Sequence, residues 1–209
     1  MLTTHKSFLI VLALSFFIFA GCSKTTVTGT WKKNDFTAQP FTSIMVVGLT
    51  KDHTHKLLWE DTMGDRLRQH GIKTVVSSLS AFPDDKQIDE KEILAYANNK
   101  GIEAVLVTRL VDTKKEDVYH PPSGAYYGGA YGHYGRFDSF YPYAYNQVYS
   151  TGYTTTQTIV LLQTNLYQVK GKELIWNMSS DTFDPRSINQ LMDSVSKKVL
   201  ATLKKEQLI

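Results

Sequence analysis

The hydrophobic pattern of residues 43–111 switches between strand-length runs and helical spacing. Three short runs rich in β-branched residues are typical of buried strands, and they cover residues 43–49, 72–77 and 102–111. Between them, residues 55–70 and a segment that begins at Asp89 carry apolar side chains at helical spacing, and each stops at a glycine. Asp89 and Glu92 have the spacing of a capping box. Because strands and helices alternate, the pattern predicts right-handed crossovers and three parallel strands.

The last third of the chain predicts a hairpin and a closing helix. Residues 154–169 and 173–180 have strand character and flank the turn Lys170-Gly171-Lys172. Ser187 and Gln190 again have capping-box spacing, and an apolar stripe follows, formed by Ile188, Leu191, Val195, Val199 and Leu203. The whole order is βαβαβ, insert, ββα. It predicts an α/β fold with a mixed sheet packed by helices, and an α+β arrangement is the alternative.

The first 22 residues are organised like a bacterial export signal. Lys6 precedes a 13-residue apolar run, residues 8–20, which only Ser15 interrupts. This run is shorter than the roughly 20 residues needed to cross a bilayer. The run ends in Phe19-Ala20-Gly21-Cys22, which resembles the lipobox of bacterial lipoproteins, with Phe19 where that family prefers leucine. The resemblance implies cleavage before Cys22 and acylation of Cys22.

The same resemblance implies a location and a domain organisation. A lipoprotein of this kind is held at the periplasmic face of a membrane, and Ser23 rather than aspartate after the cysteine implies sorting to the outer membrane. Two or three acyl chains anchor firmly, so the membrane contact comes from the lipid itself. We therefore expect a signal peptide at 1–21, a flexible polar tether at 22–40 and a single α/β domain at 41–209.

Composition narrows the range of partners. The chain has 23 basic and 20 acidic residues, and this balance does not favour a nucleic acid. One cysteine excludes an intramolecular disulfide. The hydrophobic content of 42% is in the range of globular domains, so most of the chain can build its own core.

The insert at residues 119–153 is the most unusual segment, because it holds 10 of the 12 tyrosines and many glycines. Tyrosine offers a large flat ring and a polar tip at low rotamer cost, which suits recognition of proteins or glycans. The candidate contact residues are Tyr126, Tyr127, Tyr131, Tyr134, Tyr141 and Tyr143. An envelope protein is the first expected partner, a peptidoglycan or polysaccharide chain is the alternative, and a passive linker without a ligand remains open.

Other chemistry-bearing residues do not form a motif. His53 and His55 are two apart, and His120 and His133 lie in the insert, but no three ligands are tied to one point, so no metal or other cofactor is expected. The acids Glu60, Asp61 and Asp65 share a helix with neutralising arginines, which favours a solvated face. No nucleophile elbow, phosphate loop or zinc-protease motif is present, so a hydrolase is the least favoured function and no enzyme is expected.

The element order and the lipobox together resemble small periplasmic α/β modules. These are the N-terminal domain of TolB, the CsgG-like lipoprotein domains, and lipoproteins of unknown function with tyrosine- and glycine-rich loops. The resemblance covers residues 41–205 at the level of element order. It implies a fold and no catalytic or binding residues.

Overall fold

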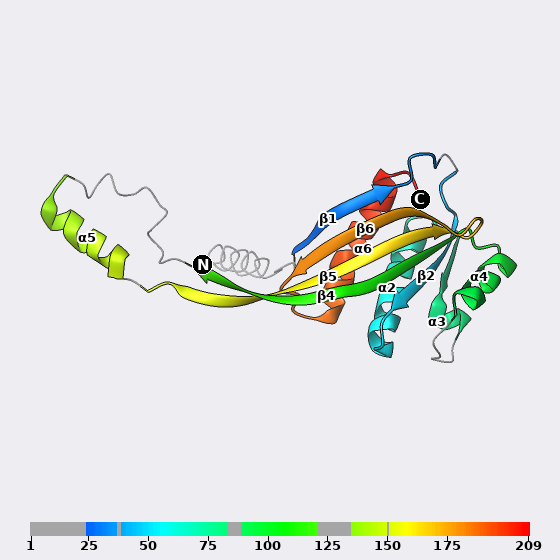
Figure 1. Cartoon of the computed structure of the whole chain (residues 1–209), viewed down its shortest axis with the longest axis horizontal. Helices are drawn as coiled ribbons and strands as arrows, with labels where there is room; N and C mark the ends of the chain where they lie inside the picture. The colour runs from blue at the N-terminus through cyan, green and yellow to red at the C-terminus, as the bar shows by residue number, and fades with distance from the viewer. Residues whose placement is uncertain (1–23, 37–38, 83–88, 121–134, 150) are drawn as a thin grey trace, which may run out of the picture.

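The computed structural model describes residues 24–36, 39–82, 89–120, 135–149 and 151–209 as a mixed six-stranded sheet with helices on both faces (Figure 1). The strands are β1 (Lys24–Lys32), β2 (Ser43–Leu49), β3 (Thr74–Ser77), β4 (Ala104–His120), β5 (Tyr153–Gln168) and β6 (Glu173–Phe183). The helices are α2 (His53–Gln69), α3 (Ser78–Ala81), α4 (Glu90–Asn99), α5 (Phe137–Tyr149) and α6 (Ile188–Lys205). None of these helices is both long and apolar enough to cross a membrane.

The sheet order is β1-β6-β5-β4-β2-β3. The strands β3, β2 and β4 are parallel, and β4, β5, β6 and β1 are antiparallel. The predicted α/β class and the three parallel strands are therefore confirmed. The β5–β6 hairpin is also confirmed, and its turn uses positive φ angles of 92° at Gly171 and 57° at Lys172.

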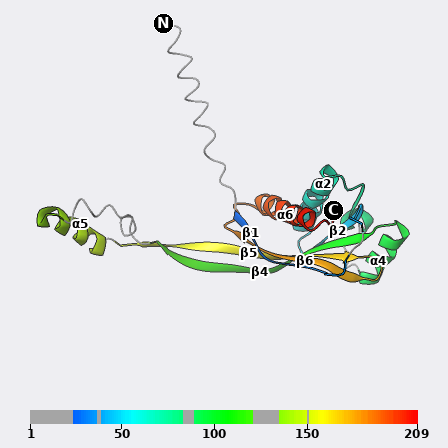
Figure 2. The ribbon, with the colours of Figure 1, turned by 90° about the horizontal axis from the view of Figure 1, so that it is seen from above.

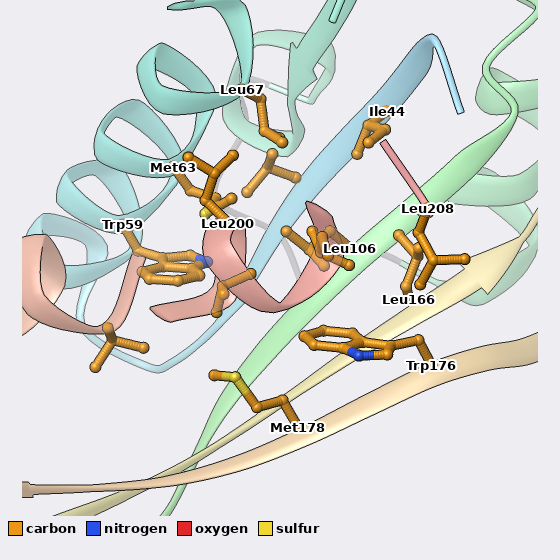
Figure 3. Packing of buried hydrophobic residues seen from close by; sticks show 14 of the residues in the cluster. Ile44, Trp59, Met63, Leu67, Leu106, Leu166, Trp176, Met178, Leu200 and Leu208 are labelled. Carbon is orange, nitrogen blue, oxygen red and sulfur yellow. The ribbon is translucent and has the colours of Figure 1, made fainter. Parts of the chain in front are cut away.

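Two helix layers of unequal extent cover the sheet. Helices α2 and α6 lie side by side on one face, whereas α4 lies on the other face at the end formed by β2 and β3 (Figure 2). The main core lies beneath α2 and α6 and includes the fully buried Trp176, Leu106 and Leu166 (Figure 3). Alternate β2 residues supply both cores, because Ile44 faces α2 and Met45 faces α4.

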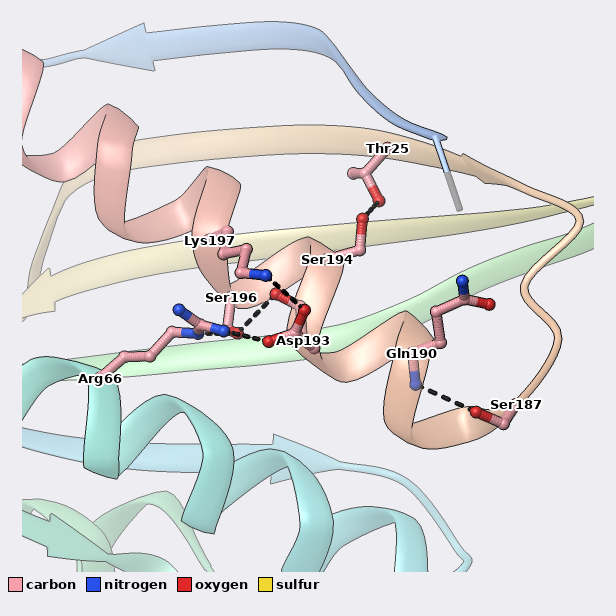
Figure 4. A network of polar contacts seen from close by, with 8 residues as sticks. All are labelled: Thr25, Arg66, Ser187, Gln190, Asp193, Ser194, Ser196 and Lys197. Atoms are coloured by element: carbon pink, nitrogen blue, oxygen red, sulfur yellow. Dashed lines mark hydrogen bonds and ion pairs between the residues drawn. The ribbon is translucent and has the colours of Figure 1, made fainter. Parts of the chain in front are cut away.

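Side-chain caps define where α4 and α6 begin. Asp89 and Glu92 form the predicted capping box of α4. Ser187 caps α6 by accepting from the Gln190 amide at 3.2 Å (Figure 4). The reciprocal bond of that box is displaced by one residue, because the Gln190 side chain accepts from the Arg186 amide at 2.8 Å.

The expectation of a flexible tether over residues 22–40 is wrong for β1. This edge strand pairs antiparallel with β6 along its whole length. Thr25 is 5% exposed and bonds to the Thr182 hydroxyl at 2.8 Å and to Ser194 on α6 (Figure 4). Threonine, valine and tryptophan are strand formers, so a segment that is polar in composition still adds an edge strand, in which Thr25 is buried and Val27 is half-buried. The predicted domain boundary at residue 41 therefore leaves out a strand of the sheet, Lys24–Lys32.

The insert also begins later than expected. Strand β4 continues to His120, nine residues past the predicted end at Val111, and pairs residue by residue with β5 back to Tyr153. Within the insert, residues 137–149 form α5, a helix that the sequence pattern did not predict. The predicted insert 119–153 therefore includes the last two residues of β4 and the first residue of β5, and otherwise lies between the two strands.

Candidate contact surface on a projecting arm

Strands β4 and β5 continue beyond the rest of the sheet as a two-stranded ribbon. One row of paired residues crosses the sheet at the place where β6 ends and β1 begins. It consists of Lys114, Ile159, Phe183 and Lys24. Beyond it, residues 115–120 pair only with residues 153–158, and we call this ribbon the arm. We call the rest of the sheet, with the helices α2, α3, α4 and α6, the body. None of the residues of the arm is buried, although the same two strands form the centre of the core in the body. Figures 1 and 2 show the arm and α5 continuing along the long axis of the sheet.

Cross-strand contacts hold the arm in register. The Thr156 hydroxyl donates to Asp117 at 2.8 Å, and the His120 ring bonds to the Thr155 hydroxyl at 2.8 Å. The His120 ring also stacks on Tyr153, with centroids 4.7 Å apart. These polar and aromatic pairs stabilise a ribbon that has no hydrophobic face.

Both outer edges of the arm lack a neighbouring strand among the described residues. On one side β2 ends at Leu49 opposite Arg109, and on the other side β6 ends at Phe183 opposite Ile159. Alternate residues of an antiparallel edge turn their backbone N–H and C=O groups outward, where they can pair with another chain. The root of the β5 edge is closed, because Asp184 accepts from the Thr158 amide at 2.7 Å and donates to its carbonyl at 2.8 Å. The open part of this edge is residues 153–157.

Helix α5 carries a row of exposed aromatic rings. Four residues spaced four apart lie on one face of the helix, and they are Phe137, Tyr141, Tyr145 and Tyr149. Their exposed fractions are 77%, 55%, 50% and 68% in that order. Successive ring centroids are 5.4, 6.1 and 4.3 Å apart, so the rings form one continuous surface. We call these four residues the aromatic stripe.

The predicted tyrosine contacts are only partly brought together. Tyr141 lies in the aromatic stripe, whereas Tyr143 is half-buried and lies about 160° away around α5 from Tyr145. The other candidates, Tyr126, Tyr127, Tyr131 and Tyr134, lie outside the described residues, as does Cys22. Four-residue aromatic spacing from Phe137 onward is the sequence signal that would have found α5.

The helical acids have separate roles and do not form an acid–base pair. Glu60 is 1% exposed and accepts from the Gly48 amide at 2.9 Å, the Leu79 amide at 3.0 Å and two serine hydroxyls, those of Ser77 and Ser78. This carboxylate ties the ends of β2 and β3 together. Asp65 forms an exposed ion pair with Arg68 at 2.5 Å, and Asp61 is exposed. The solvated-face interpretation holds for the last two and is wrong for Glu60.

The described histidines that the sequence singled out, His53, His55 and His120, lie in two separate parts of the molecule. His53 and His55 lie at the start of α2, and His120 lies on the arm; His133 lies outside the described residues. The amide of His55 donates to Asp52 at 3.0 Å, and this hydrogen bond lowers the pKa of Asp52. Within the part of the chain that the structure describes, no three histidine, cysteine or acidic side chains are placed to hold a metal ion.

Among the described residues, hollows with mainly apolar linings lie on both sides of the sheet. The larger, about 490 Å³, lies between α4 and the sheet and is lined by Val47, Ile93, Val105 and Val107 among others. The smaller, about 240 Å³, lies between the starts of α2 and α6 beside Trp59. Its polar lining residues include His55, Thr50, Thr108 and Thr113, and the Thr108 hydroxyl is hydrogen-bonded to that of Thr164 at 3.0 Å.

No family model matches the sequence, and no curated protein matches it. Among solved structures, the chain is similar to the PelC dodecamer from Paraburkholderia phytofirmans, with a TM-score of 0.48 and 15% identity over 86% of this chain and 97% of that one. It is also similar to Lipoprotein GNA1162 from Neisseria meningitidis, with a TM-score of 0.41 and 13% identity over 78% and 98% of the two chains. For the LpoB C-terminal domain from Salmonella enterica the TM-score is 0.38, with 16% identity over 69% and 85%.

Proposed function

We propose that this chain is a lipid-anchored protein of the bacterial cell envelope that acts as a binding or assembly module, with the arm as its contact surface for another envelope protein. The export signal and Cys22 support the anchor and the periplasmic side of the outer membrane. No catalytic step is proposed; the buried carboxylate Glu60 serves the fold, since it accepts from groups of β2, β3 and α3.

The observation that carries this proposal is that β4 and β5 continue as a ribbon beyond the core, where pairing the two strands buries no hydrophobic side chain. An isolated two-stranded ribbon is marginal in water. Exposed strand edges also invite pairing with foreign chains, so proteins commonly shorten, cover or charge them. An arm of this kind is useful to a protein that binds an extended segment of a partner through backbone hydrogen bonds.

The test is a deletion that shortens the arm and keeps each remaining side chain on the same face of the ribbon. Deleting the four facing pairs 116–119 and 154–157 joins Lys115 to His120 and Thr158 to Tyr153, which keeps the alternation and leaves the insert attached. We expect cross-linking in living cells, at matched abundance, to capture a partner with the intact chain and to lose it with the shortened chain.

A matched control separates the loss of arm length from the effect of changing residues on the open edge. Thr154→Ser together with Thr156→Ser keeps the full arm and every backbone group. Capture that persists in this control and fails in the shortened chain supports pairing along the edge. Equal capture by intact and shortened chains would contradict the arm as the contact surface.

A further inference from the structure

We propose that the aromatic stripe of α5 rests in the headgroup region of the membrane that holds acylated Cys22, so that the protein touches one leaflet at two separate points. The inference rests on the lipid anchor of the proposed function. It assigns a lipid surface to the stripe and leaves the open edges of the arm to the protein partner. The argument starts from the chemistry of the stripe and then uses the place where the chain enters the fold.

The stripe has the chemistry of a membrane–water interface. Three of its four residues are tyrosines, whose rings favour the apolar side of the boundary and whose hydroxyls favour the wet side. Asp138 is the only charged residue within α5, and it pairs with Arg136 at 2.9 Å. The helix therefore offers apolar and hydroxyl contacts without a net charge, which suits zwitterionic lipid and needs no anionic lipid.

The chain enters the fold at the root of the arm. Lys24, the first residue of β1, pairs with Phe183, which pairs with Ile159 in the row where the arm begins. Cys22 is two residues earlier, so a fully extended chain separates it from Lys24 by only about 7 Å. Acylation of Cys22 thus holds the root of the arm, which is the middle of the molecule's long axis, against the headgroups.

This short connection restricts the direction of the arm. The arm cannot enter the hydrocarbon, because its edges carry unpaired backbone groups and its residues include Lys115, Glu116 and Asp117. The body, with charged helices on its surface, cannot enter it either. With its middle held at the surface, the long axis must run along the membrane. The six residue pairs of the arm span about 20 Å, so α5 lies beside the same leaflet.

The test measures the depth of α5 in the acylated full-length mature protein, held in phosphatidylcholine vesicles. Cys22 is the only cysteine and its sulfur is used by the lipid, so one introduced cysteine takes a single nitroxide label. We compare Tyr145→Cys in the stripe with Tyr143→Cys on the opposite face of α5 and with Lys91→Cys on α4. Tyr145 and Lys91 are exposed, so these two changes leave the core intact.

The nitroxide label at position 145, the stripe label, is expected to lie about 5–10 Å into the boundary between headgroups and acyl chains. It should therefore collide little with an aqueous nickel chelate and often with oxygen dissolved in the membrane. The labels at Tyr143 and Lys91 are expected to stay several-fold more accessible to the chelate. Adding Phe137→Ser and Tyr141→Ser releases the stripe label into water, whereas Tyr141→Phe alone retains it. High salt leaves the depth unchanged, because no cationic group holds the helix.

The outcomes separate the two proposals. If mass spectrometry finds Cys22 acylated while labels at Tyr145 and Tyr143 are equally accessible to water, the lipid contact is wrong and the anchor stands. If Cys22 carries no lipid, both are wrong. A photoreactive residue at Tyr141 that cross-links to a protein or a glycan in cells, instead of to lipid, also overturns the assignment of the stripe.

Discussion

Strands β4 and β5 run through both the body and the arm, but the two regions differ in how much surface each residue buries. In the body, alternate residues of β4 and β5, such as Leu106 and Leu166, are completely buried against α2 and α6. In the arm the alternation has no consequence for burial, because both faces are exposed. The body is therefore held by hydrophobic burial, whereas the arm is held by backbone pairing and a few polar contacts. Because the arm adds little to the stability of the fold, we infer that its length serves contact with a partner, as proposed above.

The largest expected difference comes from equivalent changes in the two halves of β4. Leu106→Ala empties a fully buried site and is expected to lower the free energy of unfolding by about 3 kcal/mol. Val118→Ala, on the arm, is expected to change it by less than about 0.5 kcal/mol. Urea unfolding followed by circular dichroism measures both. Comparable losses for the two variants would mean that the arm belongs to the cooperative core.

A second expected loss concerns the buried polar junction of the body. Glu60→Gln replaces one accepting oxygen by an NH₂ group that faces donors from β2, β3 and the start of α3, and it leaves at least one buried donor unpaired. This is expected to cost about 2 kcal/mol. The control is Asp65→Asn on the same helix, whose exposed ion pair contributes little. Thermal unfolding of both variants tests the assignment, and equal shifts in Tm would contradict a structural role specific to Glu60.

The sequence predicted the body better than the arm, for a physical reason. Hydrophobic periodicity reports burial, so it identified the three parallel strands, the hairpin and the stripe of α6. It missed β1, whose sequence is mostly threonine and lysine, and the outer half of β4, where no face is buried. Edge pairing leaves only a weak preference for threonine and valine in the sequence.

The candidate site was predicted by composition and not by geometry. The tyrosine-rich insert was correctly singled out as unusual, but its residues were treated as one loop. Of its described part, the structure assigns residues 119, 120 and 153 to the arm and 137–149 to a helix, on which Tyr141 and Tyr143 lie apart. Such a division depends on the backbone pairing of β4 with β5, which no single segment of the sequence reveals.

A smaller change in the free energy of unfolding is expected from the polar contacts between α2 and α6. Asp193 accepts from Lys197 at 2.7 Å and pairs with Arg66, which also donates to Ser196 at 2.7 Å (Figure 4). The hydrogen bond from Lys197 and the charges of both cations lower the pKa of Asp193. A lowered pKa stabilises the fold above the ordinary pKa of aspartate, and this contribution is lost as the pH falls below about 4.

Asp193→Asn is therefore expected to lower the free energy of unfolding at pH 7 by about 0.5 kcal/mol, because Asp193 is nearly half exposed and its ion pairs are screened. Unfolding measured from pH 7 down to pH 3 should show the gap between the two proteins closing at the acid end. A gap that stays constant across this range would mean that the lost stability is steric.

The smallest energetic effect, and the sharpest separation of the two regions, is expected in amide hydrogen exchange of the free protein. Amides of β4 in the body, residues 104–110, exchange through opening of the whole fold, whereas amides of the arm, residues 115–120, exchange through local opening at almost no cost. If the arm is a contact surface, its outward amides slow when the partner is bound, while the body amides do not change. Slow exchange along the entire arm in the free protein would instead show that contacts within this chain stabilise it, and the need for a partner to explain the length of β4 and β5 would disappear.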